Sequence, residues 1–546
     1  MAGKARHIGV RLEGERDEQV RHVSYRPGAN LRDILDASSA RVRAGCSGIG
    51  ACGLCRVRVD AGEGGAPTAA ERLHLGDEAV AAGTRLACQI VPSGDMDVTV
   101  LDPARPSPWR TPAHFSYRAA YPLSGGRASD SRPLGIAVDV GTTHISVAIC
   151  DVLRGGRVAV RSGPNPQARV GADVIGRLDA AARSKSAAQR LRTLALDAIG
   201  SALLELSRDE GLALPAVGQV RVVGNSAMLT LLSGRSPDGM LDPSGWTAPV
   251  DCTLVDAVAV AEGWQLSPST AIELVQPLGG FVGSDLVAGV VRCRLIERRE
   301  PALLVDFGTN SEIALWDGRR LWVTAAAGGP AFEATGIGCG MGAEPGAIHR
   351  LARSSDGAWV GEVLEAAPAR GICGSGFVDL LAIFRASREI DERGRPLREP
   401  LTVTVGGVEL GLSKADVDAL QRAKGAVGAG VEVLCRRAGV SFDRIGAVHV
   451  AGSFGEHLDL ANAIAIGLLP PVPTGRVTLA GNTALQGALD LLLSREADAA
   501  LERVRERATL VNLSMEEDFE ELFVDHLHIR KMSARSRAGA SDRRWP

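Results

Sequence analysis

The feature that most constrains the fold of this chain is a strand, turn and strand pattern that occurs twice. In each copy an apolar strand ends at an aspartate, a turn containing Gly-Thr follows, and alternating apolar residues begin a second strand. The two turns are Asp139-Val-Gly-Thr-Thr143 and Asp306-Phe-Gly-Thr-Asn310. Two hairpins of the same design predict a duplicated unit, which constrains most of the chain after residue 134.

The chemistry of these turns favours phosphate as a ligand. Backbone N–H groups of Gly and Thr in a tight turn form a concavity that binds anions, and an aspartate at the strand end can hold Mg2+ directly or through water. Two facing copies would clamp a nucleotide between them. A single turn of this kind also fits an ordinary strand turn with an aspartate cap, so the interpretation depends on the repetition.

Three later segments also run from a strand into a turn of small residues. Residues 221–229 and 478–485 each combine a strand, a Gly-Asn turn and the start of a helix, and we interpret them as a second echo of the duplication. Asn, Ser and Thr are residues that cap helices. Between these two segments, a strand over 448–451 leads into Gly452-Ser-Phe-Gly455, and a helix is expected over 458–466.

Four of the ten cysteines lie near the N-terminus in a spacing typical of an iron–sulfur protein. Cys46, Cys52 and Cys55 form C-x5-C-x2-C, and Cys88 follows after 32 further residues. The plant-type [2Fe-2S] pattern is C-x4-C-x2-C followed by a distant Cys, so the first gap here has one extra residue. Glycine adopts the dihedrals that turn backbone N–H groups toward the sulfides. The loop contains Gly45, Gly48, Gly50 and Gly53.

The sequence around these cysteines predicts a small β-grasp sheet. Ile8, Val10 and Leu12 alternate, a short helix is expected over 31–37, and further strands are expected near 57–59 and 98–101. Residues 1–101 are therefore expected to form a ferredoxin-like domain. A structural zinc site is the alternative, since four thiolates also suit zinc, but zinc usually draws two tight Cys pairs and this chain has one. The other six cysteines are isolated, and we assign them no chemistry.

Composition limits the remaining possibilities. A chain of 546 residues suggests three or four domains, and a net charge of -3 argues against an extended nucleic-acid-binding surface. No apolar stretch reaches the ~20 residues of a membrane span, and no apolar segment follows the charged N-terminus, so a cytoplasmic protein without a membrane partner is expected. Six prolines in 102–133 predict an extended linker, and 531–546 is interpreted as a flexible basic tail.

The hairpins and the later turn resemble the superfamily of actin, the heat-shock chaperone ATPases and the sugar kinases. That resemblance implies that the hairpins are phosphate loops and that Gly452-Ser-Phe-Gly455 is the adenosine loop. Together with the N-terminal [2Fe-2S] domain, the chain resembles the RACo-like ATP-dependent reductive activators of corrinoid proteins from residue 7 to about residue 525. Loops such as Asn165-Pro-Gln167 occur in the order expected of those activators.

The expected fold class is therefore multidomain α/β and α+β. It consists of a β-grasp [2Fe-2S] ferredoxin domain, a linker and a duplicated actin-like (ASKHA) ATPase fold. The first actin-like subdomain, or middle domain, is expected over 134–215, and the C-terminal ATPase domain over 216–530.

The resemblance also implies roles for individual residues. The expected cofactors are a [2Fe-2S] cluster, ATP and Mg2+, and the expected cluster ligands are Cys46, Cys52, Cys55 and Cys88. Four carboxylates are expected to act in catalysis, although capping of their own loops would also explain the last two: Asp139, Asp306, Asp285 and Glu333. The expected nucleotide-binding residues are Gly141, Thr142, Thr143, Gly308, Thr309, Asn310, Gly452, Ser453 and Gly455.

The function that the resemblance implies is electron transfer coupled to ATP. The protein would pass one electron from its cluster to Co(II) of a corrinoid (cobalamin) protein in a methyltransferase system, which regenerates Co(I). A plant-type cluster has a potential near about -400 mV, and the transfer is expected to run uphill, so ATP has to supply part of the driving force. The expected partners are that corrinoid protein and an upstream electron donor, and a homodimer is left open.

Three alternatives remain open at this stage. They are a sugar-kinase-like enzyme fused to a ferredoxin, a dehydratase-activator ATPase with a [4Fe-4S] cluster between subunits, and an ATP-binding redox sensor without turnover.

Overall fold

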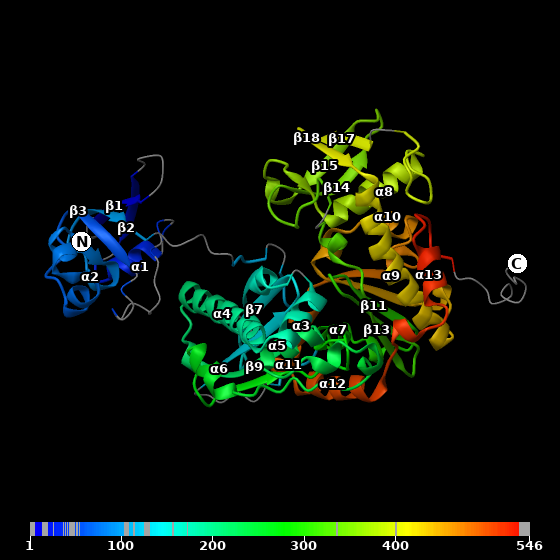
Figure 1. The fold of residues 1–546 in the computed structure, drawn as a ribbon, viewed down its shortest axis with the longest axis horizontal. Helices are drawn as coiled ribbons and strands as arrows, with labels where there is room; N and C mark the ends of the chain where they lie inside the picture. The colour runs from blue at the N-terminus through cyan, green and yellow to red at the C-terminus, as the bar shows by residue number, and fades with distance from the viewer. Residues whose placement is uncertain are drawn as a thin grey trace, which may run out of the picture. The chain divides into compact units, whose positions relative to one another are not determined.

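The computed structural model forms two compact units, Met1–Pro108 and Trp109–Pro546, which are described separately below (Figure 1). The structure describes residues 6–13, 20–25, 27–36, 38, 40, 42, 50, 53, 55–102, 109–112, 115–124, 132–155, 158–171, 173–334, 337–398 and 401–533. Cys46, Cys52, Gly45, Gly48 and most of the basic tail lie outside the described residues.

The first unit contains a five-stranded sheet in the order β2-β1-β5-β3-β4. Apolar residues alternate along β1, and this pattern correctly predicted which side chains face the core of the sheet, because Ile8 and Val10 are fully buried. The expected helix over 31–37 is confirmed as α1. The strands are β1 (Arg6–Leu12), β2 (Arg21–Tyr25), β3 (Arg56–Ala61), β4 (Thr84–Leu86) and β5 (Met96–Val100), and the helices are α1 (Leu31–Asp36) and α2 (Ala69–Ala81).

The second unit contains two larger sheets, and each is built around one of the hairpins found in the sequence. The first sheet has the order β10-β9-β6-β7-β8, and its hairpin is β6 and β7. It extends well past residue 215, because β9 and β10 belong to it. Its strands are β6 (Leu134–Val140), β7 (His144–Asp151), β8 (Ala159–Pro164), β9 (Val217–Gly224) and β10 (Ala271–Leu274). Its helices are α3 (Val174–Arg183), α4 (Lys185–Glu210), α5 (Ser226–Ser233) and α6 (Ala257–Gly263).

The second sheet has the order β20-β19-β11-β12-β13-β21, and its hairpin is β11 and β12. Its strands are β11 (Ala302–Asp306), β12 (Ser311–Trp316), β13 (Leu321–Ala326), β19 (Ala447–Ala451), β20 (Val477–Gly481) and β21 (Ala508–Leu510). The accompanying helices are α7 (Ser284–Arg292), α9 (Lys414–Ala438), α10 (Leu460–Ala465), α11 (Thr483–Leu493), α12 (Arg495–Arg507) and α13 (Phe519–His526).

Smaller elements form a lobe beside the second sheet (Figure 1). Helix α8 packs against β14, and β15 contacts β17. The lobe contains β14 (Ala347–Arg353), β15 (Trp359–Val363), β16 (Gly371–Ile372), α8 (Gly374–Ala386), β17 (Leu401–Val405) and β18 (Val408–Leu412).

The strand orders confirm the duplication but correct one part of its interpretation. In both sheets the first strand of the hairpin has a parallel neighbour on its outer side: β9 lies beside β6, and β19 lies beside β11. The topological equivalent of β9 is therefore β19, and the equivalent of β20 is β10. The proposed echo between 221–229 and 478–485 was wrong as a sign of duplication, because it pairs β9 with β20. Both strands lead into a Gly-Asn turn because Asn225 and Asn482 each cap the helix that follows.

Helices α7 and α11 follow β10 and β20, and they cross at small residues. An ideal Cβ placed on Gly487 would lie 2.2 Å from the carbonyl oxygen of Ala288, and one placed on Gly289 would lie 2.9 Å from Thr483 Oγ1. Glycine therefore permits the close crossing. Because the helices cross this closely, their N-terminal turns, which carry Asp285 and Asn482, are held in fixed positions.

The part of the predicted linker that the structure describes after residue 108 packs against the rest of the second unit. Trp109 and Tyr121 are buried, and Arg110 forms an isolated β-bridge to Ser162 of β8. The hydroxyl of Tyr117 donates to Asp490 at 2.8 Å, and the hydroxyl of Tyr121 donates to the carbonyl of Val291 at 3.0 Å. Residues 109–124 therefore have an extended course but belong to the second unit where they are described.

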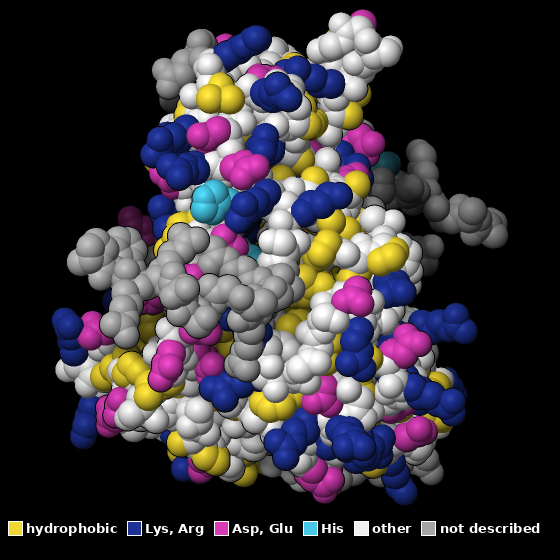
Figure 2. Space-filling model, turned by 90° about the vertical axis from the view of Figure 1, so that its right-hand side faces the viewer, with side chains coloured by type: hydrophobic (Ala, Val, Ile, Leu, Met, Phe, Trp, Pro, Cys, Tyr) yellow, Lys and Arg dark blue, Asp and Glu magenta, His cyan; other side chains and the backbone are white. Residues whose placement is uncertain are grey.

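Charge is mixed over the surface. On the face shown in Figure 2, Lys and Arg side chains lie among Asp and Glu side chains, which keeps the long-range field of that face weak. Among the described helices, none is both long enough and apolar enough to span a bilayer.

Candidate nucleotide site and iron–sulfur site

The tips of the two hairpins meet in the second unit. Thr143, after β6, and Thr309, after β11, have their hydroxyl oxygens 3.0 Å apart. Both turns are tight: the N–H of Gly141 donates to the carbonyl of His144 at 2.9 Å, and an ideal Cβ on Gly308 would lie 3.2 Å from the carbonyl oxygen of Asn310. The fold thus brings together two turns that are far apart in the sequence, as the facing arrangement predicted.

Glu333 joins the two hairpins. Its Oε1 accepts hydrogen bonds from the hydroxyls of Thr143 at 3.1 Å and Thr309 at 2.9 Å. The residue ends the short 3-10 helix Pro330–Glu333, which is anchored by Phe332. The ring of Phe332 lies 5.1 Å from that of Phe307 and 5.0 Å from that of Phe454. A carboxylate therefore lies between the two predicted phosphate loops and is positioned by an aromatic cluster.

Three aspartates gather beside the hairpins. Asp139 is the last residue but one of β6, Asp306 ends β11, and Asp285 lies in the first turn of α7. Each is partly accessible to solvent, yet burial is the main cause of its raised pKa. The charge of Asp285 adds to this effect, so the pKa of Asp139 rises to about 7 and that of Asp306 to about 8. Asn482 donates to Asp139 at 3.0 Å, which partly offsets the rise.

A fourth carboxylate, Glu312, was missed by the sequence analysis. It is only 3% exposed, it accepts from the N–H of Gly283 at 3.1 Å, and burial and then the charge of Asp285 raise its pKa well above the usual value. Glu312 and Asp285 also hydrogen-bond each other, which requires a shared proton. The register could have revealed it: Glu312 lies opposite Asp306 in the antiparallel hairpin, so the two share one face.

These carboxylates do not form a ready-made metal site. Among the described residues, no three His, Cys, Asp or Glu side chains are placed to hold a metal ion together. Mg2+ usually keeps several waters and binds through one or two carboxylates, so the carboxylate group could contact such an ion only in that way. Glu333 does not join this group in the structure, since its oxygen bonds the two threonines instead.

These pKa shifts predict that the protein without metal or nucleotide loses stability as pH rises. A raised pKa means that the folded state binds more protons than the unfolded state, whose aspartates titrate near about 3.9. The stability that Asp139 and Asp306 contribute is fully present below about pH 4, declines as pH rises, and is lost once pH has passed about 7 and about 8. In EDTA, the melting temperature of the second unit should therefore fall between about pH 4 and about pH 8 and level off above that range. The Asp306→Asn variant should show a smaller fall, and an equal fall would contradict the explanation.

The predicted adenosine turn lies against the second hairpin. Strand β19 runs parallel to β11, and the N–H of Phe307 donates to the carbonyl of Ala451 at 3.1 Å. Gly452 follows with a φ of 88°, and an ideal Cβ there would lie 2.4 Å from the carbonyl oxygen of Phe307. Only glycine fits this close approach. The turn closes with a hydrogen bond from Gly455 N–H to the Gly452 carbonyl at 3.0 Å, and the side chain of Ser453 is not described.

In the first unit, the two predicted cluster cysteines that the structure describes, Cys55 and Cys88, lie together. The thiols of Cys55 and Cys88 hydrogen-bond each other, and this bond is the main reason why the pKa of Cys88 is lowered to about 6. Gln89 Nε2 donates to Cys88 Sγ at 3.4 Å, and the N–H of Gly50 donates as well. An ideal Cβ at Gly53 would lie 2.9 Å from the Cβ of His74. Convergent thiols with nearby N–H donors fit an iron–sulfur cluster.

A buried ion pair positions the strand that leads to Cys88. Glu71 is fully buried on α2 and accepts two hydrogen bonds from Arg85, at 2.7 Å and 3.0 Å. It also accepts from the N–H of Leu86 at 3.1 Å, which fixes the end of β4 two residues before Cys88. Burial alone would raise the pKa of Glu71, but these hydrogen bonds outweigh it and lower the pKa.

Comparison with known families accounts for both units. Residues 300–537 match the C-terminal domain of RACo, the ASKHA domain, and residues 134–298 match the RACo middle region. The chain belongs to the RACo family. Residues 15–93 match the 2Fe-2S iron–sulfur cluster binding domain, which favours the iron–sulfur interpretation of the cysteines over zinc. The multidomain fold class expected from the sequence is confirmed.

Individual relatives of this RACo-family chain have related names. The corrinoid activation enzyme RamQ of Eubacterium limosum is 28% identical over 439 residues, which cover 74% of this chain and 72% of RamQ. The [Co(II) methylated amine-specific corrinoid protein] reductase of Methanosarcina barkeri is 27% identical over 255 residues, 43% of this chain and 46% of the relative. A solved structure, the reductive activator for corrinoid, iron–sulfur protein, is 25% identical with a TM-score of 0.65 and covers 96% of this chain and 98% of its own.

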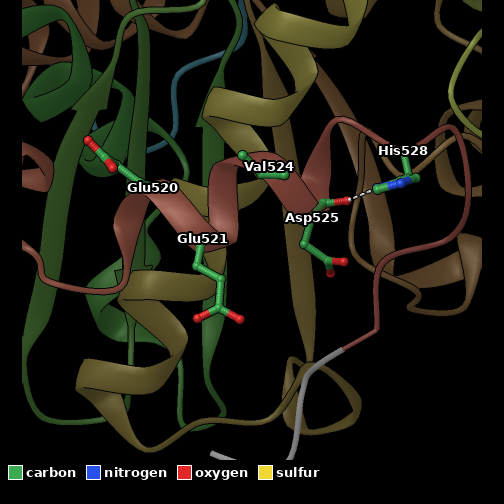
Figure 3. Close-up of a pocket in the computed structure, with 5 residues that line it drawn as sticks. All are labelled: Glu520, Glu521, Val524, Asp525 and His528. Carbon is green, nitrogen blue, oxygen red and sulfur yellow. Dashed lines mark hydrogen bonds between the residues drawn. The ribbon is translucent and has the colours of Figure 1, made fainter. Parts of the chain in front are cut away.

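A separate pocket on α13 contains none of these site residues. Glu520, Glu521, Val524, Asp525 and His528 line it. In Figure 3 the carboxylates of Glu520 and Glu521 point in different directions, and His528 Nδ1 bonds the backbone oxygen of Asp525 at 3.0 Å. The carboxylates do not converge as ligands of one cation would.

Proposed function

We propose that this protein uses ATP to reduce the cobalt of a corrinoid protein from Co(II) to Co(I). The proposal is carried by one observation: a cysteine-ligand site for an iron–sulfur cluster and a pair of facing phosphate hairpins, with hydroxyls 3.0 Å apart, occur in one chain. The names of the RACo-family relatives supply the corrinoid protein as the partner.

The N-terminal unit would serve as the electron carrier. A bound [2Fe-2S] cluster supplies one electron at a time, so each transfer oxidises the cluster by one electron and reduces one Co(II) to Co(I). The thiolates of Cys55 and Cys88, with Cys46 and Cys52, would hold the cluster. The donors to Cys88, Gln89 Nε2 and the N–H of Gly50, would stabilise negative charge on the sulfur.

The second unit would bind and hydrolyse ATP. The turns after Asp139 and Asp306 would bind the phosphates, and the turn from Gly452 to Gly455 would contact the adenosine. Bound Mg2+ would neutralise phosphate charge at the carboxylate group. Because the two hairpins belong to different sheets, a nucleotide that contacts both would fix the two halves relative to each other, which gives ATP a means to alter docking on the corrinoid protein.

The direct test is to reduce the purified protein chemically, mix it with a Co(II) corrinoid protein and follow Co(I) absorbance. We expect Co(I) to form with MgATP and to form poorly without it. Equal yields in both cases would contradict the coupling. ATP turnover that responds to a sugar and not to the corrinoid protein would favour a kinase instead.

Glu333 is expected to act on turnover more than on binding. Its Oε1 accepts from both threonine hydroxyls, which places a carboxylate where an attacking water could be oriented. Glu333→Gln keeps the shape but weakens the acceptor, so kcat for ATP hydrolysis should fall about 100-fold, the size typical of lost general-base assistance. The KM for ATP should change less than about threefold. A large rise in KM with unchanged kcat would assign Glu333 to binding only. Glu344, a half-buried carboxylate outside the hairpins whose nearest ionic partner is Arg370 at 3.9 Å, provides a control as Glu344→Gln.

A further inference from the structure

The carbonyl groups of the first hairpin turn are all held from one side. Asn165 Nδ2 donates to the carbonyl of Gly141 at 2.8 Å, and the N–H of Asn165 donates to the carbonyl of Thr143 at 2.7 Å. Between them, Arg177 Nη1 donates to the carbonyl of Thr142 at 2.8 Å. In a trans peptide the C=O and the following N–H point in opposite directions. The N–H groups of Thr142 and Thr143 therefore point away from Asn165 and Arg177.

Arg177 is a buried cation whose hydrogen-bond partners are neutral. Its side chain is only 1% exposed, and it donates to the carbonyl of Gly171 at 2.9 Å and to Met228 Sδ at 3.2 Å, in addition to Thr142. Within the described ranges, no carboxylate forms an ion pair with it. Burial lowers the pKa of Arg177 to about 10, against the opposing effect of Asp173, so it stays charged at neutral pH.

A buried charge without an ion-pair partner is costly, and a neutral amide could donate to the same carbonyls. A charge at this place has two effects that exceed those of a neutral group. It polarises the peptide between Thr142 and Thr143, which makes the N–H on the opposite face a stronger donor. The charge also adds positive potential behind the turn. An anion bound on the other face of the turn would experience this potential with little screening by water.

The second hairpin differs in this respect. Its Thr309 carbonyl accepts from the N–H of Gly329 at 3.0 Å, and its Gly308 carbonyl accepts from the Ser311 hydroxyl at 3.4 Å, both neutral donors. The buried carboxylate Glu312 lies on that hairpin instead. The two hairpins are similar in backbone, but the described hydrogen bonds to their turn carbonyls include a charged donor in the first hairpin and only neutral donors in the second.

We propose that Arg177 is a positioning residue for phosphate: from behind the first hairpin it orients the turn and strengthens the N–H groups that bind the phosphates of ATP. This inference rests on the proposed function, because it requires that the hairpins bind a nucleotide. It assigns anion recognition mainly to the first hairpin and leaves metal binding to the carboxylates.

The test compares ligands with and without phosphate. Affinities for ATP, ADP and adenosine would be measured by equilibrium dialysis for the full-length protein and for the variants Arg177→Gln and Arg177→Lys. We expect Arg177→Gln to weaken ATP and ADP at least about tenfold while adenosine binding stays within about twofold, the pattern of a lost charge-assisted contact. Arg177→Lys keeps the charge and should recover part of the loss.

Arg192→Gln is the matched control. Arg192 is also a buried arginine of the same half, 7% exposed on α4, but it is paired with Asp256 and donates to the carbonyl of Leu232 at 3.0 Å. Its variant should lower the melting temperature without changing the ratio of ATP to adenosine affinity. An unchanged ratio in Arg177→Gln would overturn the inference. If the glutamine variant does not fold, Arg177→Met, which also removes the charge, takes its place, and an unchanged ratio there has the same meaning. If the unmodified protein binds no ATP, the proposed function fails, and the inference fails with it.

Discussion

Replacing Asp306 with asparagine is expected to lower ATP hydrolysis about 100- to 1000-fold, the range seen when one preorganised electrostatic group is removed from an active site. Asp306 ends the strand of the second hairpin, beside Asp139 and Asp285, and an amide there cannot supply the negative oxygen that a cation needs. Phosphate release at saturating MgATP measures the effect. The loss should appear in kcat, since the N–H groups that bind phosphate remain.

The control for this variant is Asp443→Asn, which changes a fully exposed aspartate in the same half of the protein. It should retain turnover within about twofold, as expected for a surface substitution. Asp306→Asn should also leave the visible absorption of the cluster unchanged, because the cysteines belong to the other compact unit. Turnover close to that of the unmodified protein would remove Asp306 from the proposed machinery.

The hairpins could be predicted from the sequence because their signals are local. Alternating apolar residues define each strand, and the aspartate and Gly-Thr turn follow directly in the chain. In the register of β11 and β12, Glu312 lies opposite Asp306, so the short turn between the two strands is also a local signal for this carboxylate. The spacing of the cysteines is also a local signal, and the strands predicted around the cysteines indicate the same ferredoxin-like domain.

Features that depend on contacts between distant segments were harder to predict. Arg177 is an ordinary helix residue in the sequence, and only packing shows that it reaches Thr142, 35 residues earlier. Tyr117 reaches Asp490 across 373 residues, so composition could predict an extended linker but not that part of it docks. The Gly-Asn echo was misleading for the same reason: a helix cap looks alike wherever a strand precedes a helix, whereas strand order is a long-range property.

Replacing Cys88 with alanine is expected to abolish Co(I) formation while leaving ATP binding intact. Cys88 is a proposed cluster ligand that is 8% exposed, and its thiol bonds Cys55, so its removal takes away one of four thiolates and a contact between two of them. A cluster with three ligands is not expected to survive purification as [2Fe-2S]. Visible absorption, EPR of the reduced protein and the Co(I) assay measure the loss. ATP affinity should stay within about twofold of the unmodified protein, because the hairpins lie in the second unit.

Cys252→Ala is the control for Cys88→Ala. It distinguishes the effect of losing a cluster ligand from the effect of removing a buried thiol. Cys252 is fully buried in the second unit, and burial raises the pKa of its thiol to about 11, so it behaves as a small apolar side chain. The Cys252→Ala variant should keep both the cluster spectrum and Co(I) formation.

The Cys88→Ala variant also tests whether ATP hydrolysis depends on electron transfer. If this variant still hydrolyses ATP when the corrinoid protein is added, docking alone triggers turnover. If hydrolysis then requires the cluster, electron transfer and ATP cleavage are coupled within one cycle. Retention of Co(I) formation by Cys88→Ala would exclude this cysteine as a required ligand.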